Sequence, residues 1–142
     1  MRKSGFIISA LLIFSTLCLA QQNETKPDSV QPAIDAATQW LSLTTDGKYA
    51  ESWEEAAGFF KNAVLKTDWE ESLARLLPAY GKLVSRELLS ATYKTSLPGA
   101  PDGEYVVIKY KTKFEKKAKS IETVTPMKDS DGIWRVSGYF IH

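Results

Sequence analysis

Two charged residues inside apolar, strand-like segments are the first candidates for chemistry in this sequence. Glu122 shares one side of its segment with Val124, and Arg86 shares one side of its segment with Val84 and Leu88. A carboxylate that faces a dry cavity acquires a raised pKa and can act as a general acid or base. The same carboxylate can instead face water or form a salt bridge, and the sequence leaves these uses open.

The positions of Arg86 and Glu122 predict that their side chains can meet. In a four-stranded meander one strand separates the strands that carry them, so these strands lie about 10 Å apart. Long side chains can cross that distance on a curved sheet, provided that both face its concave side. In that case we expect an ion pair, with a tyrosine such as Tyr110 supplying hydrogen bonds.

Side chains for other common chemistries are scarce. The chain has a single histidine, His142, which is its last residue, and a single cysteine, Cys18, which lies in an N-terminal apolar run. A nucleophile paired with histidine and a zinc site of His and Cys ligands are therefore excluded. Asp129 and Asp131 lack the other ligands of a calcium loop and are predicted to lie in a hairpin turn. We assign no catalytic residue, no metal and no cofactor, and Glu122 is the only candidate base.

A row of lysines lies on the solvent side of the segment 103–114. This side begins with Tyr105 and Val107 and continues with Lys109, Lys111 and Lys113, and three more lysines follow before residue 120. One interpretation is a solvated face that discourages pairing at a sheet edge. The other is a weak contact with an anionic partner, such as lipid headgroups, polysaccharide or an acidic protein.

The tryptophans form a second group that could bind a ligand. They are Trp40, Trp53, Trp69 and Trp134. Their places on predicted helical stripes and on the expected dry side of the last strand favour the core over a pocket. Trp134 stays a predicted ligand- or partner-binding residue, together with Arg86, Tyr110, Glu122 and the lysines at 109, 111 and 113.

Apolar spacing predicts helices in the first half of the domain and strands in the second. Helical periodicity predicts helices over residues 32–44, 49–64 and 67–78, with Pro32 in the first turn. Thr67 is expected to cap the third helix, because Glu70 completes a capping box. Alternation of period two predicts strands over residues 103–114, 120–128 and 133–141. Residues 83–93 are also interpreted as a strand, although both of its faces carry apolar residues.

This element order predicts an α+β fold. Three N-terminal helices are expected to pack on one face of a curved, four-stranded antiparallel meander. Alternate residues from Val106 to Phe114 should face the helices. On the last strand, one side is expected to carry Trp134, Val136, Gly138 and Phe140.

The N-terminal residues have the pattern of a secretory signal peptide. Arg2 and Lys3 precede an apolar run over residues 6–19, and small residues lead to a cleavage site after Ala20. The run is shorter than the ~20 apolar residues that a membrane span prefers. A membrane anchor and a lipidated Cys18 are the alternatives. We expect a signal peptide at 1–20, a disordered linker at 21–31 and one domain at 32–142, exported to the periplasm or secreted, with no transmembrane span after cleavage.

Charge argues against a nucleic-acid partner. Without residues 1–20 the chain holds 16 basic and 17 acidic residues, whereas a nucleic-acid-binding domain is expected to be basic. The charge is also uneven, since residues 33–80 hold 8 acids and 4 bases while residues 82–128 hold 10 bases and 5 acids. The sheet half is therefore the positive half.

Several segments of the chain resemble one bacterial family. They are Trp53, Trp69, GKLVSR at 81–86, LPGAPDGEY at 97–105, ETVT at 122–125 and GIWRVSGYF at 132–140. Together they resemble the bacterial domain of unknown function 4019, which implies a small exported protein with no assigned activity. The element order is also similar to cystatin-like and nuclear transport factor 2-like folds, which host enzymes, binding modules and assembly modules.

Three functions follow from these observations. The preferred one is a non-enzymatic exported domain of the bacterial envelope that binds an unknown envelope protein or a small ligand through its sheet. The second is a small enzyme in a hollow between sheet and helices, with Glu122 as acid/base, which requires an ionisable group in a roomy cavity. The third is a module that assembles sheet to sheet, which requires a large apolar patch on the outer sheet face.

Overall fold

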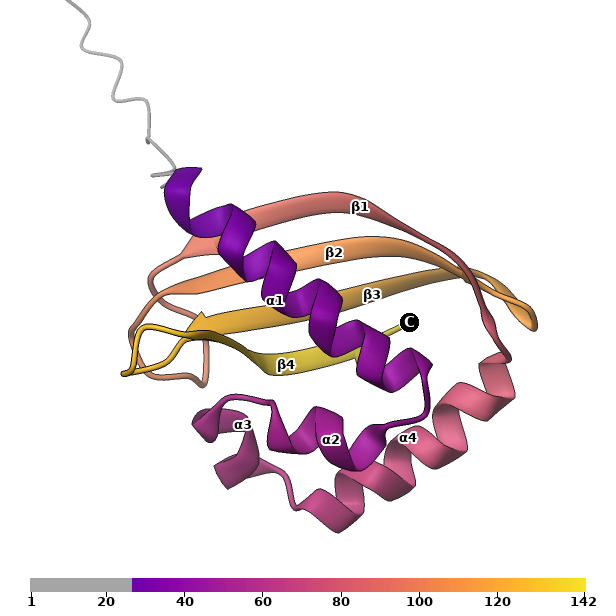
Figure 1. Cartoon of the computed structure of the whole chain (residues 1–142). Coiled ribbons are helices and arrows are strands. Elements are labelled where there is room, and N and C mark those ends of the chain that lie inside the picture. The colour runs from indigo at the N-terminus through magenta and orange to yellow at the C-terminus, as the bar shows by residue number, and fades with distance from the viewer. Residues whose placement is uncertain (1–26) are drawn as a thin grey trace, which may run out of the picture.

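The computed structural model describes residues 27–142, which hold four helices followed by one four-stranded sheet (Figure 1). The helices are α1 (Pro27–Thr45), α2 (Tyr49–Glu54), α3 (Gly58–Ala63) and α4 (Lys66–Tyr80). The strands are β1 (Leu83–Lys94), β2 (Tyr105–Phe114), β3 (Lys117–Lys128) and β4 (Trp134–Ile141). This order confirms the α+β class. The signal peptide predicted at 1–20 lies outside the described residues.

The sheet is the predicted antiparallel meander, with strand order β1-β2-β3-β4. Strand β2 alternates as expected, because the inward-facing residues from Val106 to Phe114 are all buried. The prediction that Tyr105 faces water is wrong, since this residue is fully buried. Its hydroxyl donates a hydrogen bond to the Pro101 carbonyl, so the loop before β2 covers its ring.

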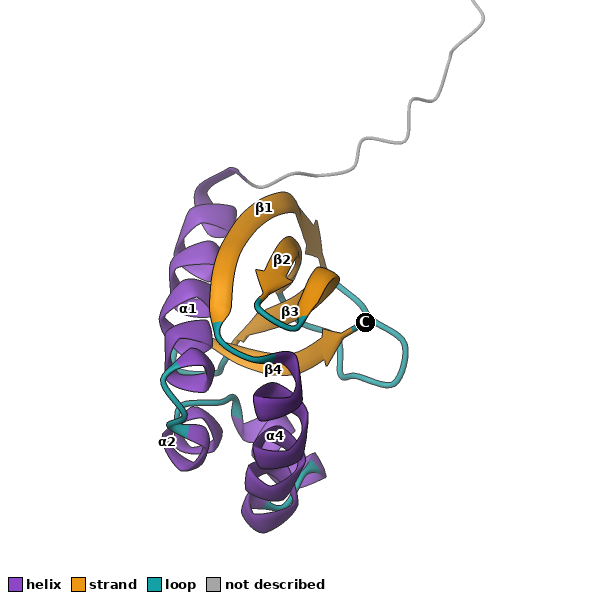
Figure 2. Cartoon of the chain, turned by 90° about the vertical axis from the view of Figure 1, so that its right-hand side faces the viewer, coloured by secondary structure: helices purple, strands orange, loops and turns teal. Residues whose placement is uncertain are grey.

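Helix α1 lies across one face of the sheet and contacts all four strands. The other helices lie beyond the β4 edge, where α2 packs against both α1 and α4 (Figures 1 and 2). The structure thus has four helices in its described part rather than the predicted three, and α1 is the one that spans the sheet. No helix of residues 27–142 covers the opposite, outer face (Figure 2), and none is long and apolar enough to cross a membrane.

The single helix predicted over residues 49–64 is wrong, because the chain breaks it into α2 and α3. At the break the backbone N–H of Ala57 donates to the carbonyl of Val136 in β4 at 2.8 Å. An amide that bonds to a strand cannot also continue a helix. The indole N–H of Trp53 then donates to the Val64 carbonyl at 2.8 Å, which ties the end of α3 back to α2.

Two helix starts also differ from the prediction. Helix α1 begins at Pro27, more than a turn before Pro32, which lies inside the helix. Residues 27–31, which were predicted to belong to a disordered linker, are therefore helical. Pro27 suits a first position for the same reason as any proline, because the N–H it lacks has no acceptor there. The capping box predicted at Thr67 is wrong, since α4 begins at Lys66 after the extended Leu65, which makes no side-chain cap. Thr67 therefore lies inside the first turn.

The core between α1, α4 and β4 is built on aromatic side chains. The Trp69 ring lies 5.8 Å from Trp40 and 5.0 Å from Phe60, measured between ring centroids. Both indole N–H groups reach Ser52, because Trp40 donates to its carbonyl at 2.7 Å and Trp69 to its hydroxyl at 2.9 Å. Trp40 and Trp69 are thus core residues, whereas Trp53 and Trp134 are only partly buried.

Strand β4 contains a bulge that reverses its alternation. Thr125 pairs with Gly138 and the next residue of β3 pairs with Val136, so Ser137 is an extra residue in β4. Val136 is buried, but beyond the bulge Phe140 points outward and is 69 % exposed. The prediction that Phe140 shares a side with Val136 is therefore wrong.

Candidate ligand-binding site

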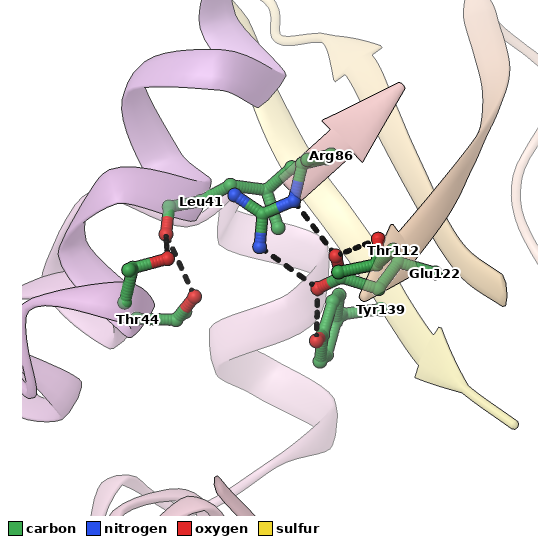
Figure 3. Close-up of polar contacts among 7 residues, drawn as sticks. Leu41, Thr44, Arg86, Thr112, Glu122 and Tyr139 are labelled. Atoms are coloured by element: carbon green, nitrogen blue, oxygen red, sulfur yellow. Dashed lines mark hydrogen bonds and ion pairs between the residues drawn. The ribbon is translucent and has the colours of Figure 1, made fainter. Parts of the chain in front are cut away.

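An ion pair between Arg86 of β1 and Glu122 of β3 lies on the inner face of the sheet (Figure 3). The Arg86 Nε donates to Glu122 Oε1 at 2.7 Å, and Nη2 donates to Oε2 at 3.2 Å. The Glu122 side chain is fully buried, and that of Arg86 is 15 % exposed. This bidentate geometry is the strong form of the arginine–carboxylate contact. The predicted ion pair is confirmed.

The two side chains meet across β2 because a small residue lies between them. Arg86 is opposite Thr112 in the β1–β2 pairing, and Glu122 is opposite Tyr110 in the β2–β3 pairing. Their charged ends therefore approach each other diagonally, over the short Thr112 side chain. A large side chain at that position would fill the space that the pair occupies.

Two hydroxyl groups complete the surroundings of the carboxylate. Thr112 Oγ1 donates to Oε1 at 2.5 Å, and the Tyr139 hydroxyl donates to Oε2 at 2.6 Å. Each carboxylate oxygen thus accepts two hydrogen bonds, and the four residues come from the four strands. Burial raises the pKa of Tyr139, and the negative charge of Glu122 raises it further. The tyrosine therefore stays a neutral donor.

Tyr110 does not take the role that the sequence predicts for it. It lies directly opposite Glu122 on β2, but its hydroxyl makes no hydrogen bond within residues 27–142. Burial raises the pKa of this hydroxyl. Thr112 and Tyr139 supply the donors to Glu122 instead.

The saturated carboxylate is poorly suited to acid/base catalysis. A carboxylate has about four lone-pair sites for hydrogen bonds, and Arg86, Thr112 and Tyr139 occupy that number at Glu122. A general base needs a free acceptor site within reach of the proton that it removes. Glu122 lacks one in this arrangement.

A cavity of about 430 Å³ opens beside the ion pair and includes both Arg86 and Glu122 in its lining. Its walls are the C-terminal ends of α1 and α4, the start of β1 and the turn between β2 and β3. A guanidinium group has five N–H donors, and Arg86 uses only two in the hydrogen bonds found among residues 27–142. Arg86 therefore has donors to spare for a molecule in the cavity.

Charged side chains line the outer part of this cavity. Lys82 and Lys116 bring positive charge, and Asp46 and Glu115 bring negative charge. Glu115 already accepts a hydrogen bond from the backbone N–H of Lys82 at 3.1 Å. The rim is thus balanced in charge, and both of its lysines are exposed and able to reach a bound molecule.

The other predicted site residues lie elsewhere. Trp134 lines a second cavity, of about 590 Å³, beside Glu51 and Glu55. Lys109, Lys111 and Lys113 lie on the outer face of the sheet and are exposed. The predicted residues therefore fall into three separate places.

The hairpin before β4 is held together by its charged residues. The guanidinium of Arg135 donates to Asp129 Oδ2 at 2.9 Å and forms a two-bond contact with Asp131. These contacts place both aspartates in the predicted turn. Among residues 27–142, no three His, Cys, Asp or Glu side chains converge to hold a metal ion.

Thr112 and Tyr139 belong to the site but were not predicted from the sequence. Thr112 could have been predicted, because it is a polar residue in the predicted inward row of β2. Tyr139 could not have been predicted in this way, because the bulge at Ser137 turns its side chain inward against the alternation of β4.

Comparison with known proteins gives a family but no function. The profile of a family described as a protein of unknown function, DUF4019, matches residues 36–139. The match covers α1 from its third turn onward and almost all of the sheet. No curated protein matches the chain. The chain therefore belongs to the DUF4019 family.

Proposed function

We propose that this protein is a non-enzymatic domain that binds a small organic acid in the cavity beside Arg86. One observation carries the proposal. Arg86 borders an open cavity with N–H donors to spare, while its partner Glu122 is saturated by four hydrogen bonds. The pair therefore presents a fixed guanidinium rather than a reactive carboxylate.

The chemistry of the cavity supports a ligand with a carboxylate at its buried end. Guanidinium groups match planar oxyanions in two-bond geometry, and Glu122 holds that of Arg86 in one orientation. A group held in advance loses less conformational entropy when a ligand binds. Arg86 neutralises the charge of Glu122, and the exposed Lys82 and Lys116 can reach a bound anion from the rim.

We also propose a fold type and a cellular location for this domain. The order of helices and meander, with α1 crossing the concave sheet, supports a cystatin-like or nuclear transport factor 2-like architecture, and cavities between sheet and helix host ligands in many folds. We further propose export to the periplasm or beyond the cell. The charged, apolar and small-residue pattern of residues 1–20 supports this.

Binding is tested by calorimetric titration of small organic acids and amino acids into the protein and into Arg86→Lys. The variant keeps the charge but loses the planar fork, so an acid that binds the natural protein is expected to bind about 10-fold to 100-fold more weakly, the usual range for one charged hydrogen bond. Arg75→Lys is the matched control, because Arg75 is 78 % exposed on α4. It should leave the affinity unchanged.

A second variant keeps the test valid if Arg86→Lys does not fold. Lys116→Gln alters only an exposed residue of the cavity rim and should weaken binding several-fold without change in the near-ultraviolet circular dichroism. Equal affinity of all variants, or binding that is lost on Trp134→Ala instead, would place the ligand outside this cavity and refute the proposal.

Export is tested by the intact mass of the protein recovered from the cell envelope. We expect a chain that begins at Gln21, because the small residues before it match a signal-peptidase site. A recovered mass that still contains residues 1–20, or that carries lipid on Cys18, contradicts the cleavage. This measurement is independent of the cavity and tests the location alone.

A further inference from the structure

We propose that the outer face of the sheet docks on a membrane surface rich in anionic lipid. The contact surface, called here the basic face, consists of Lys109, Lys111, Lys113, Lys119, Ile121 and Phe140. These residues lie opposite to the side on which α1 packs, where no described helix covers the sheet (Figure 2). The inference is independent of the ligand cavity.

The strand pairing places the apolar residues of the basic face among its lysines. Lys109 pairs with Thr123, which in turn pairs with Phe140 of β4. Lys111 pairs with Ile121 in the next row. Residues that are directly opposite in an antiparallel pair point to the same face. Phe140 and Ile121 therefore lie among the lysines of the basic face.

The lysines of the basic face have no partners within the described residues. None of the four ammonium groups forms an ion pair or hydrogen bond there, and Glu87, opposite Lys111, is the acidic residue of β1 on this face. Alternate residues of one strand are about 7 Å apart. Like charges held at that spacing repel each other, and an external anionic surface removes that cost.

The bulge at Ser137 gives this face its apolar contact. It turns Phe140 outward, where the ring is 69 % exposed. An exposed aromatic ring beside several lysines matches a lipid interface, in which charged headgroups lie over an apolar layer. A second copy of this chain would bring the same positive charge against it, and an acidic polysaccharide has no apolar layer to accept Phe140 and Ile121.

The test measures how lipid vesicles protect individual lysines of the full chain from acetylation, read by mass spectrometry. Site-resolved labelling separates the basic face from any binding through the apolar residues 6–19. With vesicles of mixed phosphatidylglycerol and phosphatidylcholine, we expect Lys111 and Lys113 to be protected several-fold more than Lys48, which lies in the turn after α1. Phosphatidylcholine vesicles alone should give no such difference.

Variants then test separately the positive charge and the aromatic ring of the basic face. A lysine near an anionic membrane contributes about a fivefold gain in binding, so Lys111→Gln with Lys113→Gln should weaken the phosphatidylglycerol-dependent binding roughly 20-fold. The control with the same change of charge, Lys48→Gln with Arg75→Gln, should leave it nearly unchanged. Phe140→Ser should weaken it without changing its dependence on salt.

Three outcomes overturn the proposal. The first is equal protection of Lys48 and Lys111, and the second is protection that ignores the phosphatidylglycerol content or salt. The third is protection by an acidic polysaccharide but not by the anionic vesicles, which would assign the basic face to a polymer instead of a membrane.

Discussion

Replacing Glu122 with glutamine is expected to destabilise the folded domain by about 3–5 kcal/mol, the usual cost of leaving one partner of a buried ion pair without its counter-charge. The Arg86 side chain is only 15 % exposed and would keep its charge in that position. In the natural protein the hydroxyls of Thr112 and Tyr139 donate to the carboxylate. The N–H groups of the glutamine amide would face one of these hydroxyl donors and could not accept its hydrogen bond. Urea unfolding followed by tryptophan fluorescence measures the loss.

The same pair predicts a coupling that a double-mutant cycle can measure. Arg86→Met should also destabilise the domain, because it leaves the fully buried Glu122 without its counter-charge. The double variant should lose less stability than the sum of the single losses, since it leaves no unpaired charge. Glu54→Gln breaks the exposed contact with Lys66 and serves as the control, with little expected effect. Strict additivity of the two losses would show that the pair is not coupled.

Trp69→Ala is expected to cost about 3–5 kcal/mol, the range for removal of a large aromatic ring from a packed core. Trp69 is 8 % exposed and contacts the rings of Trp40, Phe60 and Tyr139. The substitution also leaves the Ser52 hydroxyl without the indole donor.

Urea melts of Trp69→Ala and Trp53→Ala provide the comparison. Trp53 is partly buried, and its indole donates to the carbonyl of Val64, the residue after the short α3, so its loss should cost less. A loss below about 1 kcal/mol for Trp69→Ala would contradict its place in the core. A larger loss for Trp53→Ala than for Trp69→Ala would mean that α2 and α3 carry more of the stability than their packing indicates.

The sheet could be predicted from sequence because its signal is local. In β2 each residue is followed by one that faces the other way, so the buried row from Val106 to Phe114 is visible without knowledge of its neighbours. The ion pair was predictable for a related reason. Arg86 and Glu122 are charges within apolar segments, and such charges are buried only when they are paired.

The remaining features depend on contacts between distant parts of the chain. The break between α2 and α3 arises where Ala57 bonds to Val136, and helical periodicity carries no sign of that bond. The inward Tyr139 and the outward Phe140 follow from one extra residue at Ser137, whose effect is visible only in the pairing of β3 with β4. The cavity beside Arg86 likewise forms where several element ends meet.

Each strand contributes one residue to the hydrogen-bond network around the Glu122 carboxylate, and this arrangement affects how the sheet unfolds. In an ordinary meander the outer strands fray alone, and their amides exchange with solvent sooner than those of the inner strands. Here detachment of β1 removes Arg86 from Glu122, and detachment of β4 removes Tyr139, so either event leaves a buried charge short of donors. The outer strands should therefore open together with the inner ones, and amide exchange around this network should require unfolding of the whole sheet.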